Sequence, residues 1–392
     1  MKKNNQKLII IAILLLVLSF IIYYAGQFLF YKSDNNSAVE SSAISTSTLD
    51  TDAGETAGID QNSVPVNYKH ISTVLNGRKQ EIFTIEFDPM DERVEFKPVL
   101  SFDNVFGFEK ISEIMSRTGA YGAVNGSFSY EYGDPVGMTA IDGKLWMAAT
   151  GYDTVLILDN KGARFEKPIS NIYFTFKDKK VNINMLNRSA TAGNIIMYTE
   201  EYGSTNRSQI GNTSLVVKND IVTDVWNKAK QVPIEKDCTV ISFYGKKSTL
   251  PDELGIQAGD RLKIEIKPDY PPGYQAYSCG SLLVKAGKVV APENDRWAGT
   301  LLNRDPRTAI GIKADGKIIL IVVDGRQPGY SEGFTGKELA EYLVQQGVKD
   351  AAMLDGGATS QIFFEGSLKN RPSDRGLERP VSGALIVKIR GK

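Results

Sequence analysis

Histidine is almost missing from this sequence of 392 residues, in which His70 is the only one. That scarcity excludes zinc sites built on two histidines, and any Ser-His or Cys-His catalytic dyad would have to use His70. Cysteine is also scarce: Cys238 and Cys279 cannot form a disulfide framework, and we expect two buried thiols rather than one bridge. Chemistry in this chain therefore depends on carboxylates, arginines and backbone amides.

An excess of one charge is absent as well, because Lys and Arg together number 46 and Asp and Glu together also number 46. No tract of Lys or Arg beyond the extreme N-terminus could follow the phosphates of a duplex, so we expect no nucleic-acid partner. What the sequence does have is 42% apolar residues and 36 glycines. This composition can form a large buried core, which excludes a mini-protein and a disordered chain.

One long hydrophobic run is present, at residues 8–25, and only Ser19 interrupts it. At about 1.5 Å of rise per residue, a helix of this length can span a hydrocarbon core of about 30 Å. Lysines precede the run and an acidic stretch follows it, so the positive-inside rule predicts a cytosolic N-terminus and an extracellular remainder. A cleaved signal peptide is the alternative. The run is long for one and no A-x-A site follows, so we favour an uncleaved, single-pass anchor in the cell membrane.

The composition changes after this run. Residues 33–63 are rich in Ser, Thr, Ala, Asp and Glu and contain no Lys, Arg or aromatic residue. Such a segment cannot bury enough apolar surface to order itself, so we expect a disordered linker. The sequence thus predicts three parts: a cytosolic N-terminus and transmembrane anchor (1–32), a linker (33–63) and an extracellular domain (64–392).

The third part has the pattern of an α+β fold, with a mixed β-sheet core and few helices. Its clearest stretch begins with the apolar run at residues 318–323, typical of a strand buried on both faces. Thr335 and Glu338 then form a capping box at the start of a helix that Gly347 ends. A second apolar run follows at residues 351–354. Strand, helix and strand in this order predict a right-handed crossover between two parallel strands.

An acid follows each of these strands: Asp324, in Asp-Gly-Arg326, and Asp355, in Asp-Gly-Gly. Parallel strands end at the same edge of a sheet, where open α/β sheets bind ligands, so we expect both acids there. Arg307 precedes the strand at residues 308–312, and a hairpin turn would place it beside Asp324. Each acid taken alone would be an ordinary turn residue, and Arg307 could be only its structural ion-pair partner.

Further polar groups lie in neighbouring segments. Asn125 follows a short apolar strand, and the glycine after it would let the backbone approach a ligand closely. Asn370, Glu378 and Arg379 belong to a polar loop before the last strand. Charged loop residues are usually only solvated, so this loop alone would not indicate a site.

Short stretches along most of residues 120–387 resemble, in the same order, the phosphodiester glycosidase family, whose bacterial members are associated with extracellular polysaccharide. The stretches are residues 123–129 (AVNGSFS), 135–144, 195–206 (IIMYTEEYGSTN), 278–288 (SCGSLLVKAGK), 305–311 (DPRTAIG), 322–340, 354–360 (LDGGATS) and 370–385. The resemblance implies a hydrolase that cleaves a sugar-1-phosphodiester of the N-acetylglucosamine-1-phosphate type. Its substrate would be a phosphoglycan of the cell surface or wall, and the products a free sugar and a phosphate monoester.

The resemblance also implies roles for individual residues. A carboxylate would act at the anomeric carbon, with Asp355 our first choice, Asp324 the second and Glu378 the third. Arginines would stabilise the charge of the departing phosphate, because a guanidinium binds phosphate in a bidentate manner. The substrate-binding candidates are Asn125, Arg307, Arg326, Ser331, Thr359, Ser360, Asn370 and Arg379, with Tyr330 or Phe128 available for stacking on a sugar.

Two other classes of function remain open. In a metal-dependent phosphodiesterase, the two aspartates would bind Mg²⁺ or Ca²⁺ and attack would fall on phosphorus. In a non-catalytic protein that binds cell-wall polysaccharide, the same residues would only recognise the polymer. For the glycosidase we expect no cofactor and no metal ligands among the site residues.

Overall fold

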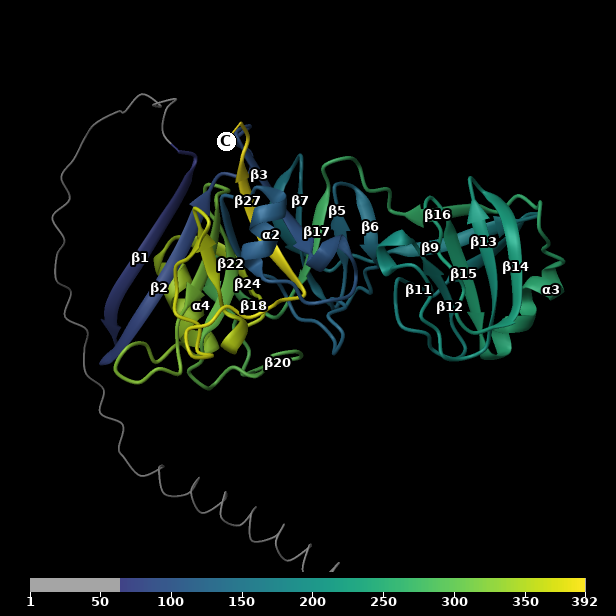
Figure 1. The fold of residues 1–392 in the computed structure, drawn as a ribbon. Helices are drawn as coiled ribbons and strands as arrows, with labels where there is room; N and C mark the ends of the chain where they lie inside the picture. Colours follow the sequence, from purple (N-terminus) through teal and green to yellow (C-terminus); the bar gives the residue numbers. More distant parts are fainter. Residues whose placement is uncertain (1–63, 392) are drawn as a thin grey trace, which may run out of the picture. The chain divides into compact units, whose positions relative to one another are not determined.

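The computed structural model describes residues 64–391, which form a mainly β structure with few helices (Figure 1). The three α-helices of this part are α2 (Ile111–Thr118), α3 (Leu250–Leu254) and α4 (Gly336–Gln345), and short 3₁₀ helices are η1 (Ser101–Asp103), η2 (Glu200–Tyr202), η3 (Gly245–Thr249) and η4 (Gly357–Thr359). None of the helices within residues 64–391 is long and apolar enough to cross a membrane. The predicted anchor at residues 8–25 and the predicted linker lie outside the described residues.

The sheet that carries the predicted crossover has seven strands in the order β1-β2-β23-β22-β24-β18-β19. Their bounds are β1 Val66–Leu75, β2 Arg78–Phe87, β23 Ile318–Val323, β22 Arg307–Lys313, β24 Val348–Met353, β18 Leu282–Lys285 and β19 Lys288–Val289. Neighbouring strands are antiparallel throughout. The strands β23 and β24 are parallel, as predicted, but they are not neighbours, because β22 lies between them and pairs with both. The expectation of a mixed sheet is therefore wrong for this sheet.

Helix α4 connects β23 to β24 and begins where the sequence predicts. The Thr335 hydroxyl accepts a hydrogen bond from the Glu338 N–H, and the Glu338 carboxylate accepts one from the Thr335 N–H, which together form a capping box. Its residues Leu339 and Leu343 are fully buried and pack against one face of the seven-stranded sheet. The helix thus covers this face of the sheet at β24, β18 and β19, and the opposite face of the sheet belongs to a second core.

That second core lies between the seven-stranded sheet and two further sheets of five strands each. One is β26-β25-β4-β27-β3 (β26 Ser367–Leu368, β25 Ile362–Phe364, β4 Gly122–Asn125, β27 Gly383–Ile389, β3 Val94–Leu100), and α2 packs on its outer face. The other is β6-β5-β17-β7-β8 (β6 Lys144–Met147, β5 Thr139–Ile141, β17 Gln275–Cys279, β7 Thr154–Asp159, β8 Gly162–Glu166). Because successive side chains of a strand point to opposite faces, each strand of the three sheets except β19 and β26 contributes side chains to this core from one face.

The chain between β8 and β17 forms two more sheets. They are β10-β9-β16 (β10 Lys179–Ile183, β9 Asn171–Phe176, β16 Lys263–Lys267) and β11-β12-β15-β13-β14 (β11 Met185–Leu186, β12 Ile195–Tyr198, β15 Thr239–Tyr244, β13 Asn212–Lys218, β14 Ile221–Ala229). The short pair of β11 and β12 is parallel. A two-stranded pair, β20 (Asn294–Asp295) and β21 (Gly299–Thr300), follows later in the chain. In Figure 1 the two sheets between β8 and β17 lie away from α4 and β22.

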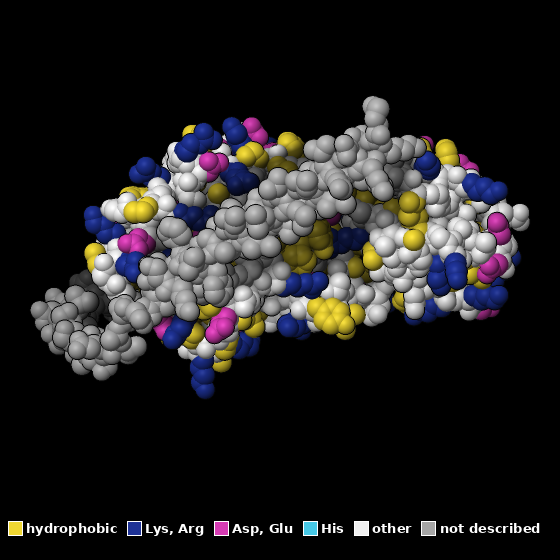
Figure 2. Space-filling view, turned by 90° about the horizontal axis from the view of Figure 1, so that it is seen from below, with side chains coloured by type: hydrophobic (Ala, Val, Ile, Leu, Met, Phe, Trp, Pro, Cys, Tyr) yellow, Lys and Arg dark blue, Asp and Glu magenta, His cyan; other side chains and the backbone are white. Residues whose placement is uncertain are grey.

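The scarce residues of the sequence lie on β1 (His70), directly before β15 (Cys238) and at the end of β17 (Cys279). Cys238 and Cys279 are buried free thiols, which confirms the prediction. His70 is exposed on β1, and its Nε2 lies 2.6 Å from Glu81 Oε2. On the face shown in Figure 2, Lys and Arg side chains are scattered among Asp and Glu rather than gathered into one basic tract.

Candidate active site

Both predicted Asp-Gly loops lie at one edge of the seven-stranded sheet. Asp324 directly follows β23, and a single residue separates Asp355 from the end of β24. The segment before β22 lies between the two loops: Gly357 N donates to Pro306 O at 2.8 Å, and a Cβ on Gly325 would lie only 2.6 Å from Pro306 N. Only glycine permits this approach of backbones. The two acids therefore share an edge, as the sequence predicts, with the start of β22 between them.

Asp324 is buried, with 1% of its surface exposed. Its carboxylate accepts hydrogen bonds from Asn370 Nδ2 (2.8 Å), Arg371 N (2.8 Å) and Tyr330 Oη (3.1 Å). Burial raises the pKa of Asp324 to about 6, although these three donors act in the opposite direction. Ser331 is also fully buried, and its hydroxyl donates to Asp324 O at 2.6 Å. Asp324 thus organises the loops around it.

Asn370 links the two Asp-Gly loops. Its Nδ2 donates to Asp324 Oδ1 and to Ser360 O (2.9 Å), and its Oδ1 accepts from Ile362 N at 3.0 Å. The side chain is buried, and both of its polar atoms have partners. Asn370 therefore holds the loops together rather than presenting a free amide to a ligand.

Asn125, at the end of β4, has a similar position beneath Asp355. Its Nδ2 donates to Asp355 O at 2.8 Å, and its Oδ1 accepts from Thr308 Oγ1 (2.8 Å) and Gln361 N (3.1 Å). Only 1% of Asn125 is exposed. The residue ties the loop of Asp355 to strand β22 and to the chain that enters β25.

Asp355 is half-buried and faces a cavity of about 520 Å³, a size that suits a small ligand. Its carboxylate accepts from Gly356 N at 2.9 Å and from Thr359 Oγ1 at 2.8 Å. Burial raises the pKa of Asp355, and the two hydrogen bonds and the charge of Arg379 oppose that increase. The lining residues of the cavity are Phe108, Asn125, Gly126, Ser127, Ser129, Tyr130, Glu131, Asp355, Thr359, Arg379, Pro380, Val381 and Ser382.

Arg379 reaches this cavity from the loop before β27. Its backbone is fixed by Gln361, whose Oε1 accepts from Arg379 N at 2.9 Å and whose Nε2 donates to Arg379 O at 2.9 Å. The Arg379 side chain is exposed and forms no hydrogen bond or ion pair with any residue of the range 64–391. A positioned backbone and an unpaired guanidinium leave this group available to an anion. Gln361 is fully buried and was not predicted from the sequence.

Serine hydroxyls without partners lie near the same place. The Oγ atoms of Ser127 and Ser360 are buried and have no hydrogen-bond partner among the described residues. Ser127 lines the cavity, and its N–H donates to Tyr277 Oη at 3.1 Å, which fixes its position. Buried hydroxyls usually have a hydrogen-bond partner, so the Ser127 hydroxyl is available to a ligand.

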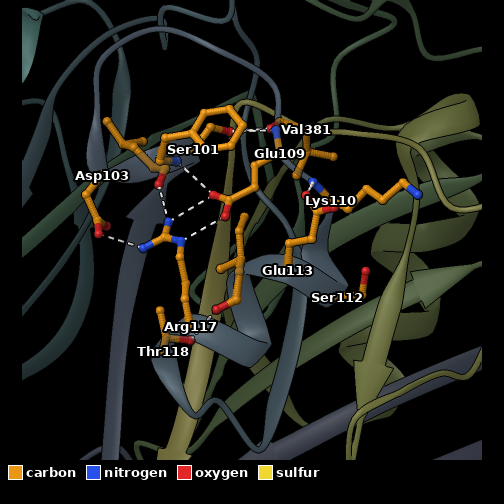
Figure 3. Close-up of polar contacts among 12 residues, drawn as sticks. Ser101, Asp103, Glu109, Lys110, Ser112, Glu113, Arg117, Thr118 and Val381 are labelled. Carbon is orange, nitrogen blue, oxygen red and sulfur yellow. Dashed lines mark hydrogen bonds and ion pairs between the residues drawn. The ribbon is translucent and has the colours of Figure 1, made fainter.

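An ion pair with the buried carboxylate of Glu109 supports one wall of the cavity (Figure 3). Arg117 Nε and Nη2 donate to Glu109 Oε1 (2.9 Å) and Oε2 (3.0 Å), while Nη1 lies 2.7 Å from Asp103 Oδ2. Glu109 and Val381 exchange two backbone hydrogen bonds, and the Ser101 hydroxyl also donates to Val381 O. This cluster holds Val381 in the wall of the cavity.

Three predicted site residues have other partners. Arg307 is 3% exposed, and its guanidinium donates to Phe334 O (2.9 Å) and Asn303 O (2.8 Å). Arg326 forms an ion pair at 2.7 Å with the carboxylate that precedes Pro306. Both carboxylate oxygens of Glu378 accept hydrogen bonds at 2.8 Å from the N–H and hydroxyl of the second residue of α2. None of the three lines the cavity.

The aromatic residues also differ from expectation. Phe128 is buried, and the Tyr330 hydroxyl is engaged with Asp324, so neither presents a free face in the cavity. Tyr130 and Glu131 line it instead. The sequence signal for them was their place directly after the stretch AVNGSFS.

Among residues 64–391, no group of three or more His, Cys, Asp or Glu side chains is arranged to bind a metal ion. The donors around Asp324 and Asp355 are instead amides, hydroxyls and backbone N–H groups.

Part of the chain is similar to a known protein family. Residues 211–388, which include Asp324, Asp355 and Arg379, match the family model described as phosphodiester glycosidase. Over these residues the chain matches the phosphodiester glycosidase family. Asn125 and Ser127 lie outside the matched range, so the cavity also includes a segment upstream of that range.

Individual relatives match shorter stretches. The chain is 37% identical over 112 residues to the SPbeta prophage-derived uncharacterized protein YomE of Bacillus subtilis (strain 168), covering 29% of this chain and 17% of that protein. It is 32% identical over 100 residues to N-acetylglucosamine-1-phosphodiester alpha-N-acetylglucosaminidase of Bos taurus, covering 24% of this chain and 18% of that one. The matches thus span less than a fifth of either relative.

The fold has a relative among solved structures. A crystal structure of a hypothetical protein from Synechocystis superposes with a TM-score of 0.69 at 21% identity, covering 83% of this chain and 62% of that one. This similarity concerns the fold alone.

Proposed function

We propose that this protein hydrolyses a sugar-1-phosphodiester of the N-acetylglucosamine-1-phosphate type and releases the free sugar. The observation that carries the proposal is that one cavity contains both a half-buried carboxylate, Asp355, and an unpaired guanidinium, Arg379. The match to this family supports the reaction class. The relative from Bos taurus is named for the same type of linkage.

The chemistry divides between these two side chains. As the bond from the anomeric carbon to the phosphate oxygen breaks, the carbon acquires oxocarbenium character, which a carboxylate stabilises as a nucleophile or as the base for water. The raised pKa of Asp355 makes its carboxylate more basic and suits either role. The departing phosphate gains negative charge, which Arg379 would stabilise.

The remaining predicted residues would support this pair. Thr359 donates to Asp355 Oδ2 and would hold the carboxylate toward the sugar. The Ser127 hydroxyl, which has no partner among the described residues, would donate to a sugar hydroxyl or a phosphate oxygen. Asn125 and Asn370 would act through the loops that they position.

The test is hydrolysis of N-acetylglucosamine 1-(methyl phosphate) by the full-length chain in ¹⁸O water. We expect ¹⁸O in the released sugar, activity that persists in EDTA, a loss of at least about a hundredfold in Asp355→Asn, and a similar loss in Arg379→Ala. Two variants serve as matched controls. Asp315→Asn changes an exposed Asp-Gly turn at the other end of β23, and Arg375→Ala removes an exposed arginine of the same loop as Arg379.

Three outcomes would count against the proposal. Label in the phosphate, with activity lost in EDTA, would favour a metal-dependent phosphodiesterase. Retention of a phosphoglycan without release of sugar would favour a non-catalytic binding protein. Unchanged rates in both Asp355→Asn and Arg379→Ala would refute the assignment of the site.

We also propose that this reaction takes place at the outer cell surface, with the protein anchored in the membrane through residues 8–25. The hydrophobic run and the lysines before it support this placement. Accessibility of a C-terminal tag to a protease added to intact cells would test it, and a tag cleaved only after lysis would contradict it.

A further inference from the structure

A second, larger cavity of about 860 Å³ adjoins the candidate active site. The two cavities share Tyr130 and Glu131 as lining residues, so they adjoin at these residues. The larger one extends over the loop of residues 130–137 and the segments 148–153, 183–191 and 296–297. A ligand that occupies the active site could therefore continue into this groove, which we call the side groove.

Aromatic side chains are unusually exposed along the side groove. Tyr152 is 79% exposed, Tyr132 67% and Tyr130 48%. The ring of Trp297 meets that of Tyr130 edge to face, with 5.8 Å between the ring centres. Exposed aromatic surface in a concave site indicates a binding function, because leaving it in water is unfavourable. Flat aromatic faces of this kind can stack on the apolar faces of sugar rings.

An exposed cation lies among these rings. The Arg296 guanidinium lies 4.7 Å from the ring centre of Trp297 and 3.5 Å from Asp153. Its side chain is 66% exposed, so it can also contact a ligand in the groove. Because Glu131 and Asp134 also line the groove, a phosphate would be placed at Arg296 rather than beside these acids. A stacking surface combined with an exposed guanidinium suits a glycan that carries phosphate.

The junction between the two cavities is structurally fixed. Arg188 donates from Nη1 to Pro135 O (2.7 Å) and from Nη2 to Gly137 O (2.9 Å), and its guanidinium lies 5.8 Å from the ring centre of Tyr130. Tyr130 N also donates to Asp134 O at 2.9 Å. The loop that carries Tyr130 is thus held in the position that joins the groove to the active site.

We propose that the side groove binds a chain of sugars joined by phosphodiesters, so that the substrate is a polymer rather than a small sugar phosphodiester. This inference rests on the proposed function, since it assigns the groove to the part of the substrate beyond the cleaved linkage. The shared lining of the two cavities, the exposed aromatic rings and Arg296 carry it.

The first experiment compares N-acetylglucosamine-1-phosphate oligomers of one and six repeats, each with its terminal phosphate methylated to a diester, as substrates of the full-length chain. In Tyr152→Ala and Trp297→Ala we expect kcat/KM for the long oligomer to fall roughly tenfold while the value for the short one is unchanged. Trp226→Ala is the matched control, because Trp226 is 38% exposed on β14 and lines neither cavity. Equal losses on both oligomers, or none on the long one, would overturn the proposal.

The second experiment measures binding without turnover, by calorimetric titration of the six-repeat oligomer into Asp355→Asn. Adding Tyr152→Ala and Trp297→Ala to this variant should weaken binding at least about tenfold. This experiment separates the two proposals. If the protein does not hydrolyse the oligomer but its binding is weakened by the two substitutions, only the proposed function is contradicted. If neither substitution changes the affinity, the assignment of the side groove is contradicted. If a neutral N-acetylglucosamine oligomer of equal length binds as tightly, the inference that the groove recognises phosphodiester-linked sugars would be overturned.

Discussion

The buried carboxylate of Asp324 should make the stability of this protein fall as the pH rises. Its pKa is about 6 in the folded chain, against 3.8 for an unperturbed Asp, because burial disfavours the charged form. Between these two pH values the folded state retains a proton that the unfolded state releases. The resulting stabilisation is complete below pH 3.8 and is lost as the pH rises through about 6. A difference of about 2 pH units corresponds to about 3 kcal/mol.

Asp324→Asn removes this titration while keeping the shape of the side chain. The new amide nitrogen would face a donor, either Arg371 N or Asn370 Nδ2, in place of an accepting oxygen. That mismatch costs about 1–3 kcal/mol, independently of pH. The free energy of unfolding of the wild type minus that of the variant should therefore be about 2–3 kcal/mol larger at about pH 4 than at about pH 7.5.

Urea unfolding of the full-length chain, followed by circular dichroism over this pH range, measures the difference. Asp315→Asn provides a control of opposite sign. Slight burial raises the pKa of Asp315, but the N–H and ammonium of Lys317 lower it by more, so the pKa lies below its ordinary value. The contribution of Asp315 to stability should therefore grow with pH. The reasoning would be refuted if the free energy of unfolding of the wild type minus that of Asp324→Asn stayed constant across this pH range or grew with pH.

The cavity and its wall support three other predictions. Because burial raises the pKa of Asp355, the acidic limb of the pH profile of kcat/KM should lie above pH 3.8, and a limb at or below that value would contradict its role as the ionised carboxylate. Gly126→Ala should lower the free energy of unfolding in urea by about 2 kcal/mol and abolish hydrolysis, because a Cβ at this position would overlap the Tyr277 hydroxyl. A variant as stable as the wild type would disprove the close packing. Arg117→Ala should lower the free energy of unfolding by about 2 kcal/mol, because the Glu109 carboxylate would stay buried without its bidentate partner. Adding Glu109→Gln should restore part of this stability, and no recovery would argue against that mechanism.

Local chemistry in the sequence predicted the crossover well. The apolar run at residues 318–323 is β23, and the capping box of Thr335 and Glu338 begins α4. The order of strands was harder to predict. The position of β22 between β23 and β24 depends on long-range strand pairing. The hydrophobic patterns of β23 and β24 do not show whether the two strands pair directly or lie on either side of a third strand.

The site was predicted less completely, because residue type does not show which groups a side chain contacts in the folded chain. The predicted residues that line the cavity are Asn125, Asp355, Thr359 and Arg379. Arg307 instead donates to backbone carbonyls in the interior, and similar tertiary contacts occupy Arg326 and Glu378. The amide of Gln361 positions Arg379, yet a single glutamine before a strand has no sequence pattern that indicates such a role.

The two Asp-Gly loops show how similar motifs can take different roles at one sheet edge. Asp324 accepts from three donors and is 1% exposed, so contact with a substrate would require breaking hydrogen bonds that hold two loops. Asp355 has only two close donors and faces the cavity. Asn370 connects the loops by bonding to both Asp324 and Ser360 O. A change in the charge of Asp324 would therefore reach Asp355 through the position of the loop rather than through direct contact. In the proposed function, Asp324 would act as a positioning residue and Asp355 would meet the sugar.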